Sequence, residues 1–101
     1  MDYRKLEEGI IDNALEYGKK YNLEIDEDFA LIKLYEEVGE YAQAVLIHRK
    51  KCRPEKFVDE AVSKKEMAME LADVVGMAVV NAHAQGIDLL AALQEKWLKN
   101  K

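Results

Sequence analysis

Two short groups of acidic residues lie in stretches that have helical periodicity. Glu70 and Asp73 are the only acidic residues between Met67 and Ala84, in a run that is apolar on nearly every side. That composition predicts a largely buried helix. Residues three positions apart project from the same helix face, so the two carboxylates are neighbours. Burying two adjacent like charges is costly unless something compensates them, which makes both residues candidate ligands for a cation.

The second group consists of Glu36, Glu37 and Glu40, whose three- and four-residue spacing also favours one helix face. If the two helices face each other, Glu37 and Glu40 meet Glu70 and Asp73. Four carboxylates of this kind suit Mg²⁺, with Mn²⁺ as a substitute. The alternative is that the glutamates of the second group lie on a solvated face beside a neighbouring lysine.

Two glycines, Gly39 and Gly76, lie inside these two acidic stretches. Glycine costs about 1 kcal/mol relative to alanine in a helix interior. Small residues at these positions would allow a second helix, or a ligand, to approach closely.

Four helices are expected to carry these residues, in an all-α chain that forms a single domain over residues 1–101. Asp2 and Asp88 are the predicted caps of the first and last helices, and Ser63 with Glu66 has the form of a capping box that opens the third. Gly86 suits the left-handed position that ends the third helix. The predicted helices span residues 3–21, 28–51, 64–85 and 89–100, and a loop with room for one helical turn spans residues 53–62.

The composition of the chain argues against several classes of protein. The chain of 101 residues has 15 Lys and Arg against 20 Asp and Glu, a net charge of −5. An acidic chain argues against nucleic acid as a partner, because phosphate affinity comes from basic clusters. A single cysteine, Cys52, excludes an internal disulfide framework and a multi-cysteine zinc site. The chain contains no run of about 18 apolar residues, so no membrane span is predicted. Its first residues are polar and charged, so no secretory signal is predicted either. The expected location is the cytoplasm.

The acidic groups and their surroundings resemble the MazG-type all-α nucleoside triphosphate pyrophosphohydrolases over about residues 29–100. The segments that carry the resemblance are Lys33-Leu34-Tyr35-Glu36-Glu37-Val38-Gly39-Glu40, Glu70-Leu71-Ala72-Asp73-Val74-Val75 and Gly86-Ile87-Asp88-Leu89, followed by Glu95-Lys96 and Lys99-Asn100. The resemblance implies a four-helix MazG-like bundle that is completed by dimerisation, in a homodimer or homotetramer.

The same resemblance implies a Mg²⁺-dependent hydrolase that cleaves a nucleoside triphosphate between the α- and β-phosphates. The products would be a nucleoside monophosphate and pyrophosphate, in the clearance of surplus or non-standard nucleotides. By motif, the metal ligands would be Glu37, Glu40, Glu70 and Asp73. The attacking water would be oriented or deprotonated by Glu36, which lies beside Glu37. The residues that bind phosphate or sugar would be Lys33, Lys96 and Asn100. Met77 stands where deoxycytidine-triphosphate members often have an aromatic residue, which leaves the preferred base open.

Two other functions fit the same residues. One is a phosphoribosyl-ATP pyrophosphohydrolase-like enzyme, and the other is a non-catalytic helical oligomer that binds nucleotides. His48 and His83 lack a glutamate three residues earlier, so neither is expected to be a metal ligand. The basic segment 49–56 is either a solvated helix end or a loop that reaches a triphosphate in a neighbouring subunit. Trp97 is expected to pack in the core or at an interface.

Overall fold

The computed structural model describes residues 1–98, and these residues form helices and connecting segments without any strand. The all-α class is therefore confirmed. In chain order the elements are α1 (Tyr3–Tyr21), α2 (Glu27–His48), the 3₁₀ turn η1 (Pro54–Lys56), α3 (Glu60–Gln85), α4 (Leu89–Leu93) and the π-helical turn η2 (Gln94–Leu98).

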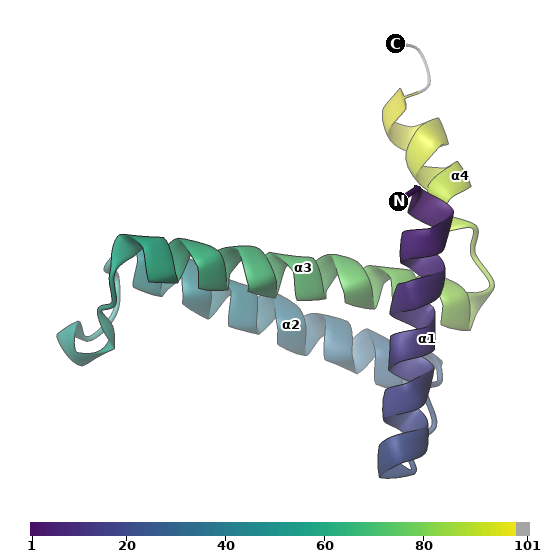
Figure 1. Ribbon diagram of the computed structural model, residues 1–101, viewed down its shortest axis with the longest axis horizontal. Helices are drawn as coiled ribbons and strands as arrows, with labels where there is room; N and C mark the ends of the chain where they lie inside the picture. Colours follow the sequence, from purple (N-terminus) through teal and green to yellow (C-terminus); the bar gives the residue numbers. More distant parts are fainter. Residues whose placement is uncertain (99–101) are drawn as a thin grey trace.

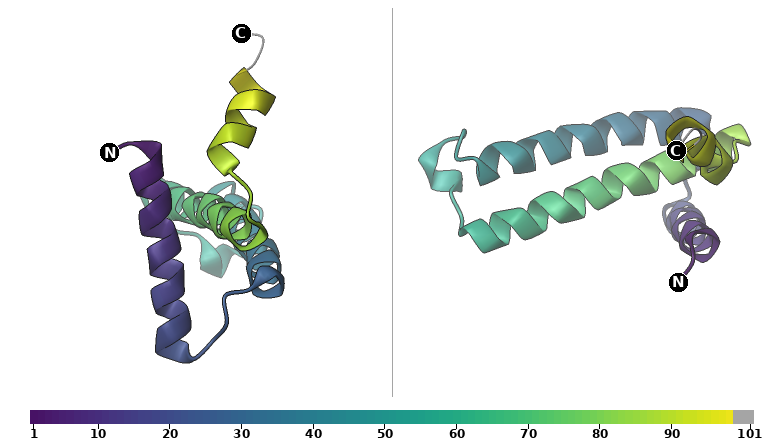
Figure 2. Two further views of the ribbon diagram at one scale, coloured as in Figure 1. Left: turned by 90° about the vertical axis from the view of Figure 1, so that its right-hand side faces the viewer. Right: turned by 90° about the horizontal axis from the view of Figure 1, so that it is seen from above.

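Helices α2 and α3 lie side by side as a long antiparallel hairpin, and η1 lies at its closed tip (Figure 1). Helix α1 crosses the open end of this hairpin and packs mainly against α3 (Figure 2). The C-terminal segment of α4 and η2 leaves the same end and points away from the hairpin. The arrangement is extended, because its radius of gyration is 16.0 Å, whereas a compact domain of 100 residues has about 13 Å.

Side-chain caps explain where the first two helices begin. Asp2 Oδ1 accepts a hydrogen bond of 2.9 Å from the backbone N–H of Lys5 at the start of α1, as predicted. Asp26 Oδ1 accepts an equivalent bond of 2.9 Å from Phe29 N–H at the start of α2. Each carboxylate satisfies a backbone donor that the helix itself leaves free, and it lies at the positive end of the helix dipole.

Helix α2 ends earlier than predicted, at His48 instead of Lys51. The backbone of Lys50 adopts the left-handed conformation (φ 58°), which turns the chain out of the helix. The N–H of Lys51 then donates to the carbonyl of Leu46 at 2.8 Å, a bond typical of a helix C-terminus closed by a left-handed residue. The basic residues after His48 consequently lie in the connection between the helices.

Helix α3 begins at Glu60, so the predicted capping box at Ser63 is wrong. Ser63 lies inside the helix and is only 2% exposed. Its hydroxyl donates to the carbonyl of Glu60 at 3.1 Å, and its Oγ lies 2.7 Å from Nδ1 of His48. Because its hydroxyl makes these two contacts, Ser63 joins α2 and α3 near the closed end of the hairpin and does not cap either helix.

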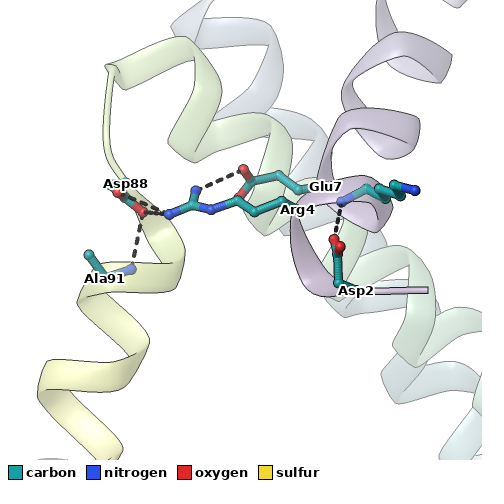
Figure 3. Close-up of polar contacts among 6 residues, drawn as sticks. Asp2, Arg4, Glu7, Asp88 and Ala91 are labelled. Atoms are coloured by element: carbon teal, nitrogen blue, oxygen red, sulfur yellow. Dashed lines mark hydrogen bonds and ion pairs between the residues drawn. The ribbon is translucent and has the colours of Figure 1, made fainter.

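The C-terminal turn begins as predicted. Gly86 ends α3 in the left-handed conformation (φ 69°), and Asp88 caps α4 by accepting a 3.1 Å bond from Ala91 N–H. Asp88 also binds Arg4 of α1, whose Nη2 lies 3.0 and 3.2 Å from its two carboxylate oxygens (Figure 3). The predicted helix 89–100 is not one regular α-helix, because α4 changes to a π-helical turn at Gln94.

The core of the single chain is small, and its buried residues on α2 and α3 lie near the two ends of the hairpin, not in its middle. On α2 the buried residues are Ala30 and Ala44; on α3 they are Ser63, Val79, Val80 and Ala82. Helix α3 is therefore not largely buried within one chain, contrary to the prediction. Four large apolar side chains along it are about half exposed: Val62 (46%), Met69 (50%), Leu71 (45%) and Val75 (56%). Trp97 is 70% exposed and does not pack into the core of its own chain.

No single helix among residues 1–98 combines the length and the apolar composition needed to cross a membrane. Residues 60–85 and 89–98 meet that requirement only when they are taken together, and a bend of 115° separates the two segments.

Candidate metal and substrate site

The structure brings the two acidic groups together across the α2–α3 hairpin. Glu37 of α2 meets Glu70 and Asp73 of α3, with one oxygen from each of the three carboxylates within 4.8 Å of the others. Glu36, Glu37 and Glu40 form a second such group on α2. Glu37 belongs to both groups, so the five carboxylates form one continuous cluster. The spacing of the motifs predicted this convergence.

Two carboxylate oxygens of the cluster are buried without a partner. Neither Glu37 Oε2 nor Glu70 Oε2 has a hydrogen-bond partner among the described residues, although both atoms are inaccessible to solvent. Burial, as the main cause, together with the charges of Glu40 and Asp73, raises the pKa of Glu37 from 4.5 to about 7. Burial and the same two neighbours also raise the pKa of Glu70. A buried, unpaired oxygen costs free energy, and a bound cation would offset this cost.

Lys33 and Glu36 lie at the edge of the cluster. The Nζ of Lys33 is 2.6 Å from Oε1 of Glu36, in an ion pair one helical turn apart. The hydrogen bond to Glu36 is the main cause that raises the pKa of Lys33, and the charge of Glu37 contributes as well. The predicted phosphate-binding lysine and the predicted water-activating glutamate therefore bind each other in the free protein.

A pocket of about 770 Å³ opens beside the cluster, between α1 and the hairpin. Glu37 and Asp73 of the cluster line this pocket together with the neighbouring Lys33, and most of its remaining wall is apolar. The contribution of α1 was not predicted from the sequence: its apolar side chains face this space together with polar ones. The α1 residues at the pocket include Lys5, Leu6, Ile10, Asn13, Ala14 and Tyr17. The sequence predicted a helix over residues 3–21, but nothing in it indicated that this helix lines a pocket.

Lys96, another predicted substrate-binding residue, is not brought to the carboxylates. Lys96 lies in η2, which extends away from the hairpin, so within one chain it does not join the cluster (Figure 1). Asn100 lies outside the described residues. Any contact that Lys96 makes with a substrate at the cluster would therefore require a second copy of the chain.

The two glycines do not serve a close approach between α2 and α3 within the single chain. A Cβ atom added at Gly39 would meet nothing within 4 Å, and one added at Gly76 would meet only Ile10 of α1, at 4.0 Å. Gly76 instead lines the pocket. Its missing side chain leaves room beside the carboxylates, which fits the second of the two roles predicted for it.

His48 is the last residue of α2 and binds Ser63, as expected for a residue at a helix end. The acidic cluster is the only part of residues 1–98 in which three potential ligand side chains gather, and it contains neither histidine nor Cys52.

The donor set can do one kind of chemistry well. Carboxylate oxygens without competing nitrogen or sulfur donors prefer hard divalent cations such as Mg²⁺. Such cations bind phosphate oxygens, and the adjacent pocket offers an apolar space for the remainder of a phosphate ester. Comparisons of the chain with protein-family models, with curated proteins and with solved structures find no match.

Proposed function

We propose that this protein is a Mg²⁺-dependent nucleoside triphosphate pyrophosphohydrolase that releases a nucleoside monophosphate and pyrophosphate. One observation carries the proposal: Glu37, Glu70 and Asp73 converge from two helices around two buried oxygens that lack partners. The cluster thus fits a hard cation by its donor type and by its unsatisfied atoms. The resemblance of the acidic motifs to the MazG-type enzymes gives the reaction.

In this proposal Glu37, Glu40, Glu70 and Asp73 would hold Mg²⁺, which would neutralise negative charge on the phosphates. Glu36 is exposed at the rim of the cluster, where its carboxylate can accept a proton from an attacking water or orient it. Lys33 leaves Glu36 and pairs with a phosphate oxygen, which frees the carboxylate for this role. Attack at the α-phosphate breaks the bond to the β-phosphate, and pyrophosphate leaves.

The pocket beside the cluster supports a nucleotide as the substrate. It is large enough for a nucleoside, and it touches the cluster through Glu37 and Asp73. Its apolar walls suit a base, while Asn13 offers both a donor and an acceptor. A nucleotide with its phosphates at the carboxylates would therefore place its base against α1.

The large exposed surface supports assembly into a homodimer or homotetramer. In this proposal the partner subunit completes the MazG-like bundle. The chain exposes 7870 Å², whereas a compact monomer of this mass exposes roughly 5,800 Å². The excess of about 2,000 Å² is comparable to the area buried in a stable interface. Met69, Leu71 and Val75 are exposed along α3 in the single chain, and a partner that packs on this face would bury them.

The test is a product assay across a panel of ribo- and deoxyribonucleoside triphosphates with Mg²⁺. We expect pyrophosphate, and not orthophosphate, from at least one of them, with loss of activity in Glu70→Gln. A product of orthophosphate and diphosphate would contradict cleavage between the α- and β-phosphates. Turnover of phosphoribosyl-ATP alone would favour the related enzyme class. Binding without any turnover would favour a non-catalytic nucleotide-binding oligomer.

A further inference from the structure

The connection at the closed end of the hairpin is strongly basic in an acidic chain. Residues 49–58, here called the basic tip, contain five Lys or Arg and one Glu, a net charge of +4 in a chain whose net charge is −5. The basic tip includes η1 and lies at the opposite end of the hairpin from α1 and α4 (Figure 1). The basic tip is therefore opposite in charge to the rest of the chain.

The cations of the basic tip are available to bind something else. Within residues 1–98, neither Lys51 nor Lys56 forms an ion pair, and both are exposed. Arg53 has one exposed pairing with Glu55, at 3.6 Å. Lys50 lies over the ring of Phe57, 5.8 Å from its centre, which leaves its charge at the surface. These groups lie close together in the sequence, before and within the η1 turn.

The carboxylate cluster, in contrast, has few cationic side chains beside it. It contains five acidic side chains, and a nucleotide triphosphate adds several further negative charges. The lysines beside it are Lys33, which pairs with Glu36, and Lys5 at the pocket wall. Divalent cations bound by the carboxylates offset part of this charge, but the outer phosphates still need donors.

The basic tip cannot supply those donors to the cluster of its own chain. Glu40 is the last carboxylate of the cluster on α2, and Arg49 is nine residues further on. Nine residues of helix span about 13 Å along the axis, which exceeds the reach of an extended lysine or arginine side chain. The tip closes the far end of the hairpin, so direct contact between its cations and a carboxylate cluster requires the cluster of another copy.

We propose that the basic tip of one copy binds the phosphate chain of a nucleotide held at the carboxylate cluster of a second copy. The inference rests on the proposed function for the anion it recognises, and it adds a component of the site supplied by the partner. Charge complementarity between the tip and the outer phosphates selects this occupant. Each site then needs two copies of the chain, one for the carboxylates and one for the cations.

The simpler alternative is that these cations only stabilise the C-terminal end of α2, where the helix dipole favours positive charge. The two explanations differ in the quantity that changes on mutation. Loss of a helix-end charge lowers thermal stability, whereas loss of a phosphate donor lowers anion affinity.

The test compares two variants that each lose two exposed lysines. Lys51→Gln/Lys56→Gln neutralises the basic tip, and Lys19→Gln/Lys20→Gln removes the same charge from α1 as a control. Binding of inorganic tripolyphosphate in the presence of Mg²⁺ is measured by calorimetry. We expect the tip variant to bind at least about tenfold more weakly than wild type, and the control to bind like wild type. The difference should shrink at high salt.

A mixed assembly decides whether the tip acts on a second copy. The tip variant and Glu70→Gln are co-expressed with different tags, so that a hybrid dimer pairs an intact cluster with an intact tip from the other copy. If pairing is random, about a quarter of the wild-type number of tight sites should return. Each variant alone should show none.

Three results would overturn the proposal: wild-type binding by the tip variant, a loss that the hybrids do not restore, or no binding by wild type. Failure of the proposed function would look different. Tight tripolyphosphate binding that depends on the tip, without pyrophosphate release from any nucleotide, would remove the hydrolase and leave the shared anion site intact.

Discussion

The ammonium group of Lys33 lies 2.6 Å from Oε1 of Glu36, at the edge of the carboxylate cluster and at the wall of the pocket. In the free protein the pair keeps a cation beside the carboxylates and holds Glu36 in place. A phosphate that enters the pocket competes with Glu36 for this lysine. The ion pair is therefore a resting contact that substrate binding would break.

Replacement of Lys33 by alanine should impair substrate use far more than folding. Loss of one charge-assisted phosphate contact costs roughly 1.5–3 kcal/mol, or about 10- to 150-fold in kcat/KM. An exposed pair within one helix contributes only about 0.3–0.5 kcal/mol to stability, so the melting temperature should hardly change. Steady-state kinetics and a thermal melt check both parts, with Lys20→Ala as the control. Unchanged kinetics would place Lys33 outside the substrate site.

Replacement of Glu70 by glutamine should abolish activity and leave the metal-free fold at least as stable. The change keeps the shape of the side chain and removes one of several mutually repelling charges. Wild type should gain stability with Mg²⁺ or Mn²⁺, because a ligand that binds only the folded state stabilises it. The variant should gain much less.

The control for this comparison is Glu66→Gln, one helical turn before Glu70 on α3, which should respond to metal like wild type. Thermal melts with and without metal provide the measurement. A Glu70→Gln protein that melts well below wild type without metal, while metal shifts neither, would make Glu70 a structural residue.

The metal-free protein should lose stability as the pH rises toward neutrality. The pKa of Glu37 is about 7 in the folded chain and 4.5 in its ordinary state. Between these values the folded state holds a proton that the unfolded state has released, so the contribution of Glu37 is present below pH 4.5 and is lost through about pH 7. Melts in a chelator at pH 5 and pH 8 should show a smaller decline in Glu37→Gln. Equal declines in both proteins would contradict a raised pKa at this residue.

Two glycine substitutions should have opposite effects on the single chain. A Cβ at Gly18 would lie 2.8 Å from both the carbonyl oxygen of Leu23 and Cγ1 of Ile25. Gly18→Ala should therefore cost about 1–3 kcal/mol through overpacking. A Cβ at Gly39 meets nothing within 4 Å, so Gly39→Ala should gain about 0.5–1 kcal/mol from helix propensity. Denaturant unfolding measures both, and a destabilised Gly39→Ala protein would indicate that a partner packs there.

Local signals in the sequence determined much of the fold. The bounds of α1 and the caps at Asp2 and Asp88 follow from short-range hydrogen bonds, and these were predicted correctly. The start of α3 was missed because Ser63 binds His48, a residue of another helix, and no local pattern contains that contact. The π-helical turn after α4 likewise had no signal in the periodicity.

The candidate site divides in the same way. Convergence of the carboxylates was predictable, since three-residue spacing on two antiparallel helices places them on facing surfaces. The pocket was not predictable, because it depends on where α1 crosses the hairpin and not on any motif in α1. The apolar composition of the third helix predicts burial but does not say which residues the chain itself covers, and Val75 is among those it leaves exposed.

The uneven distribution of buried residues has a consequence for how the hairpin opens. Ala44 and Ser63 are buried near the tip, and Ala30, Val79, Val80 and Ala82 are buried near the open end, so the carboxylates lie between two better-packed regions. Segments with few buried apolar contacts open locally at a low free-energy cost. In the metal-free protein, backbone amides around residues 36–40 and 70–73 should exchange their hydrogens with solvent sooner than those at either end. A bound cation would join α2 and α3 in this less well packed region, so metal binding would also raise the free energy of local opening of the hairpin.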